Sequence, residues 1–121
     1  MQGIAPNNGY RQRFLVKKGI EWIVLPTAEI AYCYSAHKLV FLIGPGGEKH
    51  IVDKSLNDLE KELDPSLFFR INRKYLANIH HIRKIKALSK GKLSVDLSPR
   101  TAEDILISQE RAAAFKIWVG N

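Results

Sequence analysis

Short runs of β-branched and aromatic residues recur along the first half of the chain, separated by turn residues. These runs predict strands at residues 14–16, 20–25, 30–34, 39–43 and 50–52. The turns between them include Lys18-Gly19, Pro26-Thr27, Ser35-Ala36-His37-Lys38 and Gly44-Pro45-Gly46-Gly47. Because such connections are too short for the helical crossovers of parallel strands, the pattern favours an all-β meander.

Residues 55–63 have helical periodicity instead, with three leucines on one face. Ser55 is the expected N-cap, and Asp64-Pro65 should end the helix. The other face is acidic, because it carries Asp58, Glu60 and Glu62. We therefore expect this face to point away from any nucleic acid.

The last third of the chain predicts a hairpin, a strand and a second helix. Residues 79–88 and 93–97 flank the turn Ser89-Lys90-Gly91-Lys92, and residues 104–107 form a further strand. Residues 109–119 form the helix, with Ser108 as N-cap and a buried stripe of Ala112, Phe115 and Val119. The fold class is mostly β, with short antiparallel strands in small sheets, one short internal helix and one C-terminal helix. Residues 1–12 have the composition of a flexible tail or linker, which leaves residues 13–121 as the domain.

The charge is concentrated in one part of the chain. Between Pro65 and Val95 there are eight Lys and Arg residues and no carboxylate, whereas the other 11 cations face 12 anions. The whole net charge of +7 therefore lies in this basic block, residues 70–92. Such a concentration favours a surface that binds a polyanion, nucleic acid before acidic metabolites or membranes. The alternative is a solvated basic surface.

Several classes of function are not supported. Cys33 is the single cysteine, which excludes an intramolecular disulfide and suits the reducing cytoplasm. The longest apolar run, residues 39–43, is too short to span a bilayer, and no signal segment opens the chain. No phosphate-binding loop, nucleophile elbow or metal-binding spacing is present, so we expect no enzyme activity, cofactor or metal. His80 and His81 are adjacent in a predicted strand and should point to opposite faces.

Three segments carry side chains suited to nucleic acid. Asn72, in a stretch of cations, has an amide that can pair with adenine, although residue type alone favours a turn or cap residue that bonds its own backbone. His37 lies at an exposed turn, where it can contact a base or be an ordinary turn histidine. Ser108 opens the last helix, whose free N–H groups can bind an anion, with Gln109 and Arg111 beside it.

Residues 68–82, FFRINRKYLANIHHI, closely resemble the signature of LytTR-type DNA-binding domains, the output modules of many bacterial response regulators. The signature is two aromatics, Arg, any residue, His or Asn, a cation, a serine-like position, an aromatic, and then an apolar stretch ending in Asn. The resemblance extends from about residue 13 to 119 and includes the His37 loop and the start of the last helix.

The resemblance implies a mostly-β domain that reads DNA through loops in successive major grooves. It places His37 and Lys38 in the first contact segment, and Asn72, Arg73 and Lys74 in the second. The third is the entry to the last helix, where many members have a cation directly after the serine. This chain has Gln109, then Glu110, then Arg111, so either Gln109 or Arg111 makes the contact beside Ser108. Lys90 and Lys92, at the basic turn, are expected to contact phosphates.

The sequence therefore predicts the C-terminal effector domain of a two-component response regulator, which binds specific double-stranded DNA at paired or repeated sites. Its expected partners are an upstream receiver domain and, through that domain, a histidine kinase, with no membrane partner. The expected location is the cytoplasm, in association with the nucleoid when bound. The alternative is an RNA-binding, single-strand-binding or interaction module without a role in transcription.

Overall fold

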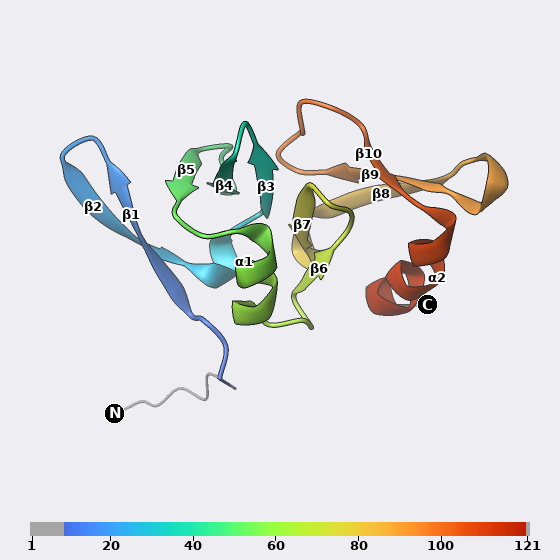
Figure 1. Cartoon of the computed structure of the whole chain (residues 1–121), viewed down its shortest axis with the longest axis horizontal. Coiled ribbons are helices and arrows are strands. Elements are labelled where there is room, and N and C mark those ends of the chain that lie inside the picture. The colour runs from blue at the N-terminus through green and yellow to red at the C-terminus, as the bar shows by residue number, and fades with distance from the viewer. Residues whose placement is uncertain (1–8, 121) are drawn as a thin grey trace.

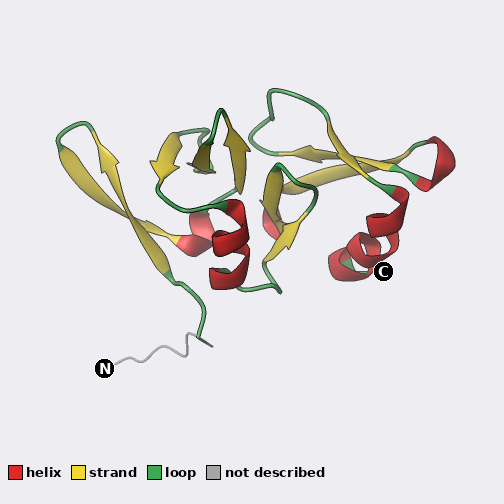
Figure 2. Cartoon of the chain, viewed as in Figure 1, coloured by secondary structure: helices red, strands yellow, loops and turns green. Residues whose placement is uncertain are grey.

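The computed structural model describes residues 9–120, which form three antiparallel sheets and two α-helices. Figure 1 shows the sheets arranged along the long axis of the molecule, and Figure 2 shows that strands make up most of the fold. The predicted tail lies in part outside the described residues. Within it, the backbone N–H of Arg11 donates to the Glu62 carbonyl at 2.8 Å, so residue 11 is attached to the domain.

The central sheet has five strands in the order β5-β4-β3-β7-β6. These strands are β3 (Tyr32–Ala36), β4 (Leu39–Ile43), β5 (Lys49–Val52), β6 (Phe68–Arg70) and β7 (Tyr75–Asn78). The pairing of β3 with β7 joins segments that are far apart in the chain, with Tyr34 opposite Tyr75. It therefore brings the turn at His37 close to the loop between β6 and β7, residues 71–74.

Two smaller sheets lie at the ends of the central sheet (Figure 1). One is a hairpin of β1 (Arg13–Lys18) and β2 (Glu21–Pro26). The other has the order β10-β9-β8, with β8 (Ile82–Ala87), β9 (Leu93–Leu97) and β10 (Ile105–Ile107). The helices are α1 (Leu56–Glu62) and α2 (Gln109–Val119).

The central sheet is buried on both faces because its strands alternate side chains between two cores. On one face, Cys33, Leu42 and Leu76 pack with α1 and the β1–β2 hairpin. On the other, Tyr32 and Ala77 pack with the three-stranded sheet and α2. Cys33 is fully buried, and burial raises the pKa of its thiol, as expected for a small core residue.

Both predicted helices are confirmed. The Ser55 hydroxyl accepts a hydrogen bond from the Asp58 N–H at 3.0 Å, which caps α1 as predicted. Ser108 occupies the N-cap position of α2 without such a side-chain bond. Ala112 and Phe115 form the buried stripe of α2, but Val119 is only half-buried.

Two predictions about strands were incomplete or wrong. The β6–β7 hairpin was not predicted, because β6 has only three residues and ends in Arg70. The predicted strand at residues 79–88 begins only at Ile82, since Ile79–His81 forms a 3-10 turn. The buried Asn78 starts this turn by accepting a hydrogen bond from the His80 N–H at 2.9 Å. His80 and His81 therefore do not alternate across a strand.

Within residues 9–120, no helix is long and apolar enough to cross a membrane.

Candidate nucleic-acid interface

The first candidate contact segment is the two-residue turn between β3 and β4. Ala36 pairs with Leu39, so His37 and Lys38 alone form the tip, with φ values of 53° and 66°. Positive φ at both central residues is typical of type I′ turns, which normally use Asn or Gly there because other residues are strained. Both side chains are exposed, and neither forms a hydrogen bond or ion pair with another described residue. The turn therefore presents both side chains to solvent at a fixed position.

Asn72, in the second segment, is bonded within its own loop. Its Oδ1 accepts hydrogen bonds from the N–H groups of Lys74 at 2.8 Å and Tyr75 at 3.0 Å. Its Nδ2 donates to the Leu106 carbonyl at 3.1 Å, which attaches the loop to β10. These bonds correspond to the turn-forming alternative. Bidentate pairing with adenine would need the Oδ1 that already accepts two bonds.

Arg70 holds the same loop from the other side. Its guanidinium donates to two loop carbonyls, those of Asn72 and Arg73, each at 2.8 Å. It also donates to Asn57 Oδ1 at 2.9 Å and to Glu60 Oε1 at 3.1 Å, which ties the loop to α1. Only 16% of the Arg70 side chain is exposed. Arg70 is therefore used to position the loop, although its sequence position suggested a contact with the polyanion.

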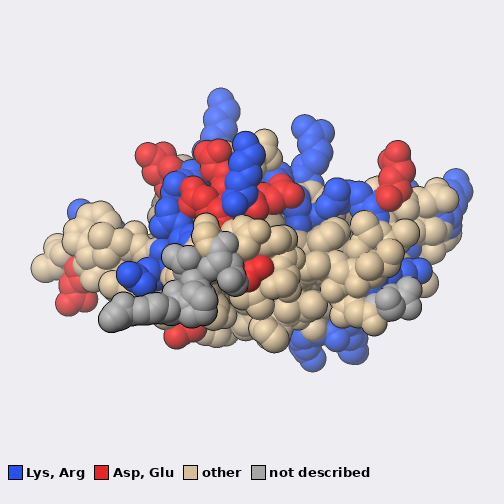
Figure 3. Space-filling view, turned by 90° about the horizontal axis from the view of Figure 1, so that it is seen from below, with Lys and Arg blue, Asp and Glu red and all other residues tan. Residues whose placement is uncertain are grey.

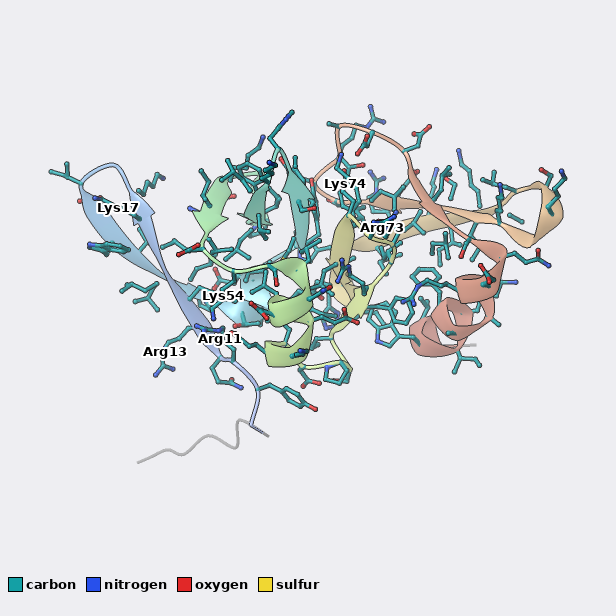
Figure 4. All side chains as sticks on the ribbon, viewed as in Figure 1. Arg11, Arg13, Lys17, Lys54, Arg73 and Lys74 are labelled. Atoms are coloured by element: carbon teal, nitrogen blue, oxygen red, sulfur yellow. The ribbon has the colours of Figure 1, made fainter. Side chains whose placement is uncertain are left out.

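Two further cations of the candidate interface also have partners within the protein. Lys74 forms an ion pair with Glu103. Arg111 donates to the Arg70 carbonyl, and its guanidinium carbon lies 5.1 Å from the Phe69 ring centroid. By contrast, the Arg73 side chain is exposed and has no hydrogen bond or ion pair with another residue in the described range. Figure 4 labels Arg73 and Lys74 on this loop.

The third segment, at the start of α2, lies beside the tip of the β8–β9 hairpin. A Cβ on Gly91, which has a φ of 74°, would be 2.9 Å from Gln109 Cγ. This close approach, together with the positive φ, favours glycine at position 91, and it brings the neighbouring Lys90 and Lys92 close to the N-terminus of α2. Lys90, Lys92 and Gln109 are exposed, and none of their side chains has a hydrogen-bond or ion-pair partner among the described residues.

Two hollows connect these segments. The first, of about 590 Å³, is lined by residues of the second and third segments, namely Asn72, Arg73, Lys92, Ser108 and Arg111, together with Arg70. The second, of about 610 Å³, contains both Lys38 and Arg73. Arg73 therefore lines both hollows, one shared with the first segment and the other with the third. Figure 1 shows the β3–β4 turn, the β6–β7 loop and the start of α2 in this order along the long axis.

The acidic helix α1 lies closer to this surface than the sequence predicted. Asp58 lines the hollow that contains Lys38 and Arg73, and Glu60 is paired with Arg70. Glu62 instead forms ion pairs with Lys54 at 2.7 Å and with Arg11 at 2.6 Å. The hydrogen bonds from these two side chains lower the pKa of Glu62, and the bond from Lys54 has the largest effect. Figure 3 shows most of the visible acidic side chains in one cluster with basic ones among them.

The basic block does not form one continuous surface. Arg83 and Lys86 on β8 line a separate hollow with Asp96, Glu103 and Asp104. These carboxylates lie outside the block in sequence, so their proximity could not be inferred from charge counts. Figure 4 also labels Arg13 and Lys17 along β1, a basic pair that the sequence analysis did not single out. Among residues 9–120, no group of His, Cys, Asp and Glu could hold a metal ion.

Comparison with known proteins identifies the class of the domain. The family model of the LytTr DNA-binding domain matches residues 21–120, and the chain belongs to this family. It is similar in fold to the "LytTr DNA-binding domain of putative methyl-accepting/DNA response regulator from Bacillus cereus". That match has 21% sequence identity and a TM-score of 0.76, and it covers 92% of this chain and 99% of the other. No curated protein matches the chain.

These matches confirm the predicted family and the mostly-β fold class. The family is one of DNA-binding domains, and DNA binding is therefore the general function of this chain.

Proposed function

We propose that this chain is the effector domain of a transcriptional response regulator and that it recognises a specific duplex DNA sequence through its loops. The observation that carries the proposal is the arrangement of three exposed segments along one long axis (Figure 1). Each is fixed by the fold and has polar or cationic side chains without a partner among residues 9–120. Major grooves recur along a duplex about every 34 Å, and an elongated row of protruding loops suits that repeat. Membership of the LytTr family supports the same conclusion.

Base contacts are assigned to exposed side chains on anchored backbone. His37 contacts a base from the β3–β4 turn, and Arg73 from the β6–β7 loop, where a guanidinium can donate two bonds to guanine. Gln109 makes the third contact rather than Arg111, because the guanidinium of Arg111 already bonds the Arg70 carbonyl. The pairing of Asn72 with adenine stays a prediction. The bonds of its side chain favour a role in positioning Arg73.

Phosphate contacts are assigned to the flexible cations beside these loops. Lys38, Lys90 and Lys92 supply charge that has no side-chain partner among the described residues, and Ser108 exposes the first N–H groups of α2 to a phosphate. Lys74 contributes less, because Glu103 neutralises it. Such contacts position the domain on DNA and make binding sensitive to salt, but they carry no sequence information.

The wider setting is proposed from the family. A receiver domain upstream, phosphorylated by a histidine kinase, would tether two copies, so that paired sites bind through effective concentration. This assignment places the protein in the cytoplasm, at the nucleoid when bound. The described residues include no long apolar helix that would hold a dimer. We therefore expect the isolated domain to sediment as a monomer without DNA, and a tight dimer would contradict this arrangement.

The test begins with selection of a binding duplex from a randomised pool. The domain is then titrated with that duplex, with each of its single strands and with the matching RNA. We expect the tightest binding to the duplex DNA, by about 10³-fold or more over a scrambled duplex. Equal or tighter binding to a single strand or to RNA would support the alternative, an RNA-binding or single-strand-binding module, and would overturn the proposal.

A further inference from the structure

Another groove, of about 600 Å³, lies between the central sheet and the loop that joins β9 to β10, residues 98–104, and its lining also includes His37 and Lys74 of the first two contact segments. Its lining includes four aromatic residues, Tyr32, Tyr34, Phe41 and Tyr75. These come from three adjacent strands, where Tyr34 is directly opposite both Phe41 and Tyr75. Side chains at the same level on one face of a sheet are neighbours, so the strand register builds a row of rings.

The rings of this row are nearly parallel. The ring centroids of Tyr34 and Phe41 are 5.1 Å apart, those of Tyr34 and Tyr75 are 5.7 Å apart, and both pairs are inclined by 26°. Tyr34 and Phe41 are only half-buried, so parts of their rings remain open to solvent. Because these rings stack on one another, the groove wall presents their open edges, against which a planar ring can pack edge-to-face.

Two phenolic hydroxyl groups in the groove lack a partner. The hydroxyl of Tyr32 donates to the Arg100 carbonyl at 3.5 Å, but those of Tyr34 and Tyr75 form no hydrogen bond with any described residue. Tyr75 is only 4% exposed as a residue, but its hydroxyl oxygen is not fully buried, so this group can reach a ligand in the groove. Burial, with the charge of Glu103, raises the pKa of Tyr75 to about 12, so its hydroxyl stays protonated and can donate at neutral pH.

The charge around the groove is positive. Lys49 Nζ lies 5.4 Å from the centroid of Phe41 and 5.9 Å from that of Tyr34. Neither Lys49 nor Arg100 has an ion-pair partner among the described residues, whereas Lys74 and Glu103 neutralise each other. An anion beside the rings would therefore find an unpaired ammonium group and unpartnered hydroxyl donors.

We propose that this groove is a binding site for a small planar aromatic carboxylate. The ring of the ligand packs edge-to-face against Tyr34 and Phe41. The carboxylate accepts a charge-assisted hydrogen bond from Lys49, whose flexible stem lets the ammonium move to it, and a further bond from a tyrosine hydroxyl. The site goes beyond the DNA-binding role, although His37 and Lys74 belong to both surfaces.

The test is a titration of the DNA-free domain with 2-naphthoate, followed through amide chemical shifts. We expect saturable binding with a dissociation constant of about 1 mM or lower, as is usual for a ligand of this size. The shifts should concentrate in β3, β4 and residues 98–104. Cyclohexanecarboxylate lacks the flat ring, and 2-naphthylmethanol lacks the charge. Each should bind about fivefold more weakly or worse.

Matched variants locate the site. Lys49→Gln should weaken the binding of 2-naphthoate by about fivefold or more, and Phe41→Leu should weaken it by a similar factor. The control is Lys17→Gln, because Lys17 Nζ lies 5.7 Å from the Trp22 ring on the β1–β2 hairpin and forms a similar exposed pair outside the groove. If Phe41→Leu fails to fold, the Lys49→Gln variant still tests the site, because Lys49 is exposed and its replacement should not disturb folding.

Three results would overturn the proposal. One is the absence of saturation at several times the expected dissociation constant, and another is an equal loss in Lys17→Gln and Lys49→Gln. The third is that the selected duplex, but not 2-naphthoate, shifts the amides of Phe41 and Lys49, which would make the groove part of the DNA interface.

Discussion

The β6–β7 loop and the tip of the β8–β9 hairpin are both basic, but the protein treats their charges differently. In the loop, Arg70 and Asn72 make seven hydrogen bonds through their side chains to the protein, and all of them fix backbone or tie it to α1 and β10. At the hairpin tip, Lys90 and Lys92 have no side-chain partner among the described residues. The backbone of the loop is therefore anchored, whereas the ammonium groups at the hairpin tip are unpaired within the described residues.

The difference separates two tasks of a DNA-binding surface. A base contact discriminates only if the backbone beneath it has a fixed position, because a misplaced donor cannot choose between base edges. A phosphate contact needs charge within reach and tolerates a flexible stem. A count of cations in the sequence treats Arg70 and Lys90 as equals, although Arg70 holds the loop and Lys90 has no side-chain partner among the described residues.

The largest expected effect is that of Arg70→Ala. Loss of the bonds to the loop carbonyls and to α1 should lower the free energy of unfolding by about 2–3 kcal/mol, and the melting temperature by about 5–10 °C. Binding to the selected duplex should also weaken, because Arg73 is no longer held. A thermal melt with a DNA titration measures both.

Glu60→Gln is the control for Arg70, since it removes only a partly exposed ion pair and should change stability by about 0.5 kcal/mol or less. An Arg70→Ala variant that melts like the wild type but weakens all duplexes alike would show that Arg70 contacts phosphate and that the loop does not need this anchor.

Asn72→Ala should come next. It removes the acceptor for two loop N–H groups and the bond to Leu106, so we expect a loss of about 1–2 kcal/mol in the free energy of unfolding. Asn72→Asp keeps the oxygen acceptor and should retain more of that stability. If Asn72→Ala melts normally yet loses affinity only for the selected duplex, Asn72 reads a base directly.

His37→Gly sharpens the comparison at the β3–β4 turn. Glycine relieves the positive φ of position 37, so the free energy of unfolding should stay the same or rise by up to about 1 kcal/mol. Affinity for the selected duplex should nevertheless fall by about 1–2 kcal/mol, while scrambled DNA is bound as before. His37→Ala controls for the added backbone freedom of glycine. Unchanged specific affinity in both variants would remove His37 from the interface.

The smallest effect concerns Glu62, which anchors residue 11 and Lys54. Its pKa is lowered in the folded state, so its contribution to stability is present at neutral pH. That contribution is lost as the pH falls below the ordinary value of 4.5 and through the lower folded pKa. Glu62→Gln should show a weaker loss of stability on acidification than the wild type in urea titrations. Identical pH profiles would mean that these ion pairs contribute nothing.

The sequence predicted most strands and both helices because their apolar periodicity and the cap at Ser55 are local signals. It did not predict β6, whose three residues form a strand only through pairing with β7. The site was harder, because the partners of the cations are distant in the chain. Glu103 lies 29 residues from Lys74 in the chain. The groups that accept hydrogen bonds from Arg70 include backbone carbonyls, which every residue has, so the sequence does not indicate which of them will do so. The turn-forming role of Asn72 was foreseeable from residue type alone.

The central claim is that exposed side chains on anchored backbone read the sequence, whereas Lys90 and Lys92 supply charge. The most direct test compares Arg73→Ala with the double variant Lys90→Ala/Lys92→Ala on the selected and scrambled duplexes over a range of salt concentrations. Arg73→Ala should lower the ratio of specific to non-specific affinity by about tenfold or more, with little change in salt dependence. The double variant should keep that ratio and reduce the slope of log K against log salt by about two. The reverse pattern, or the same pattern in both, would contradict this division of roles.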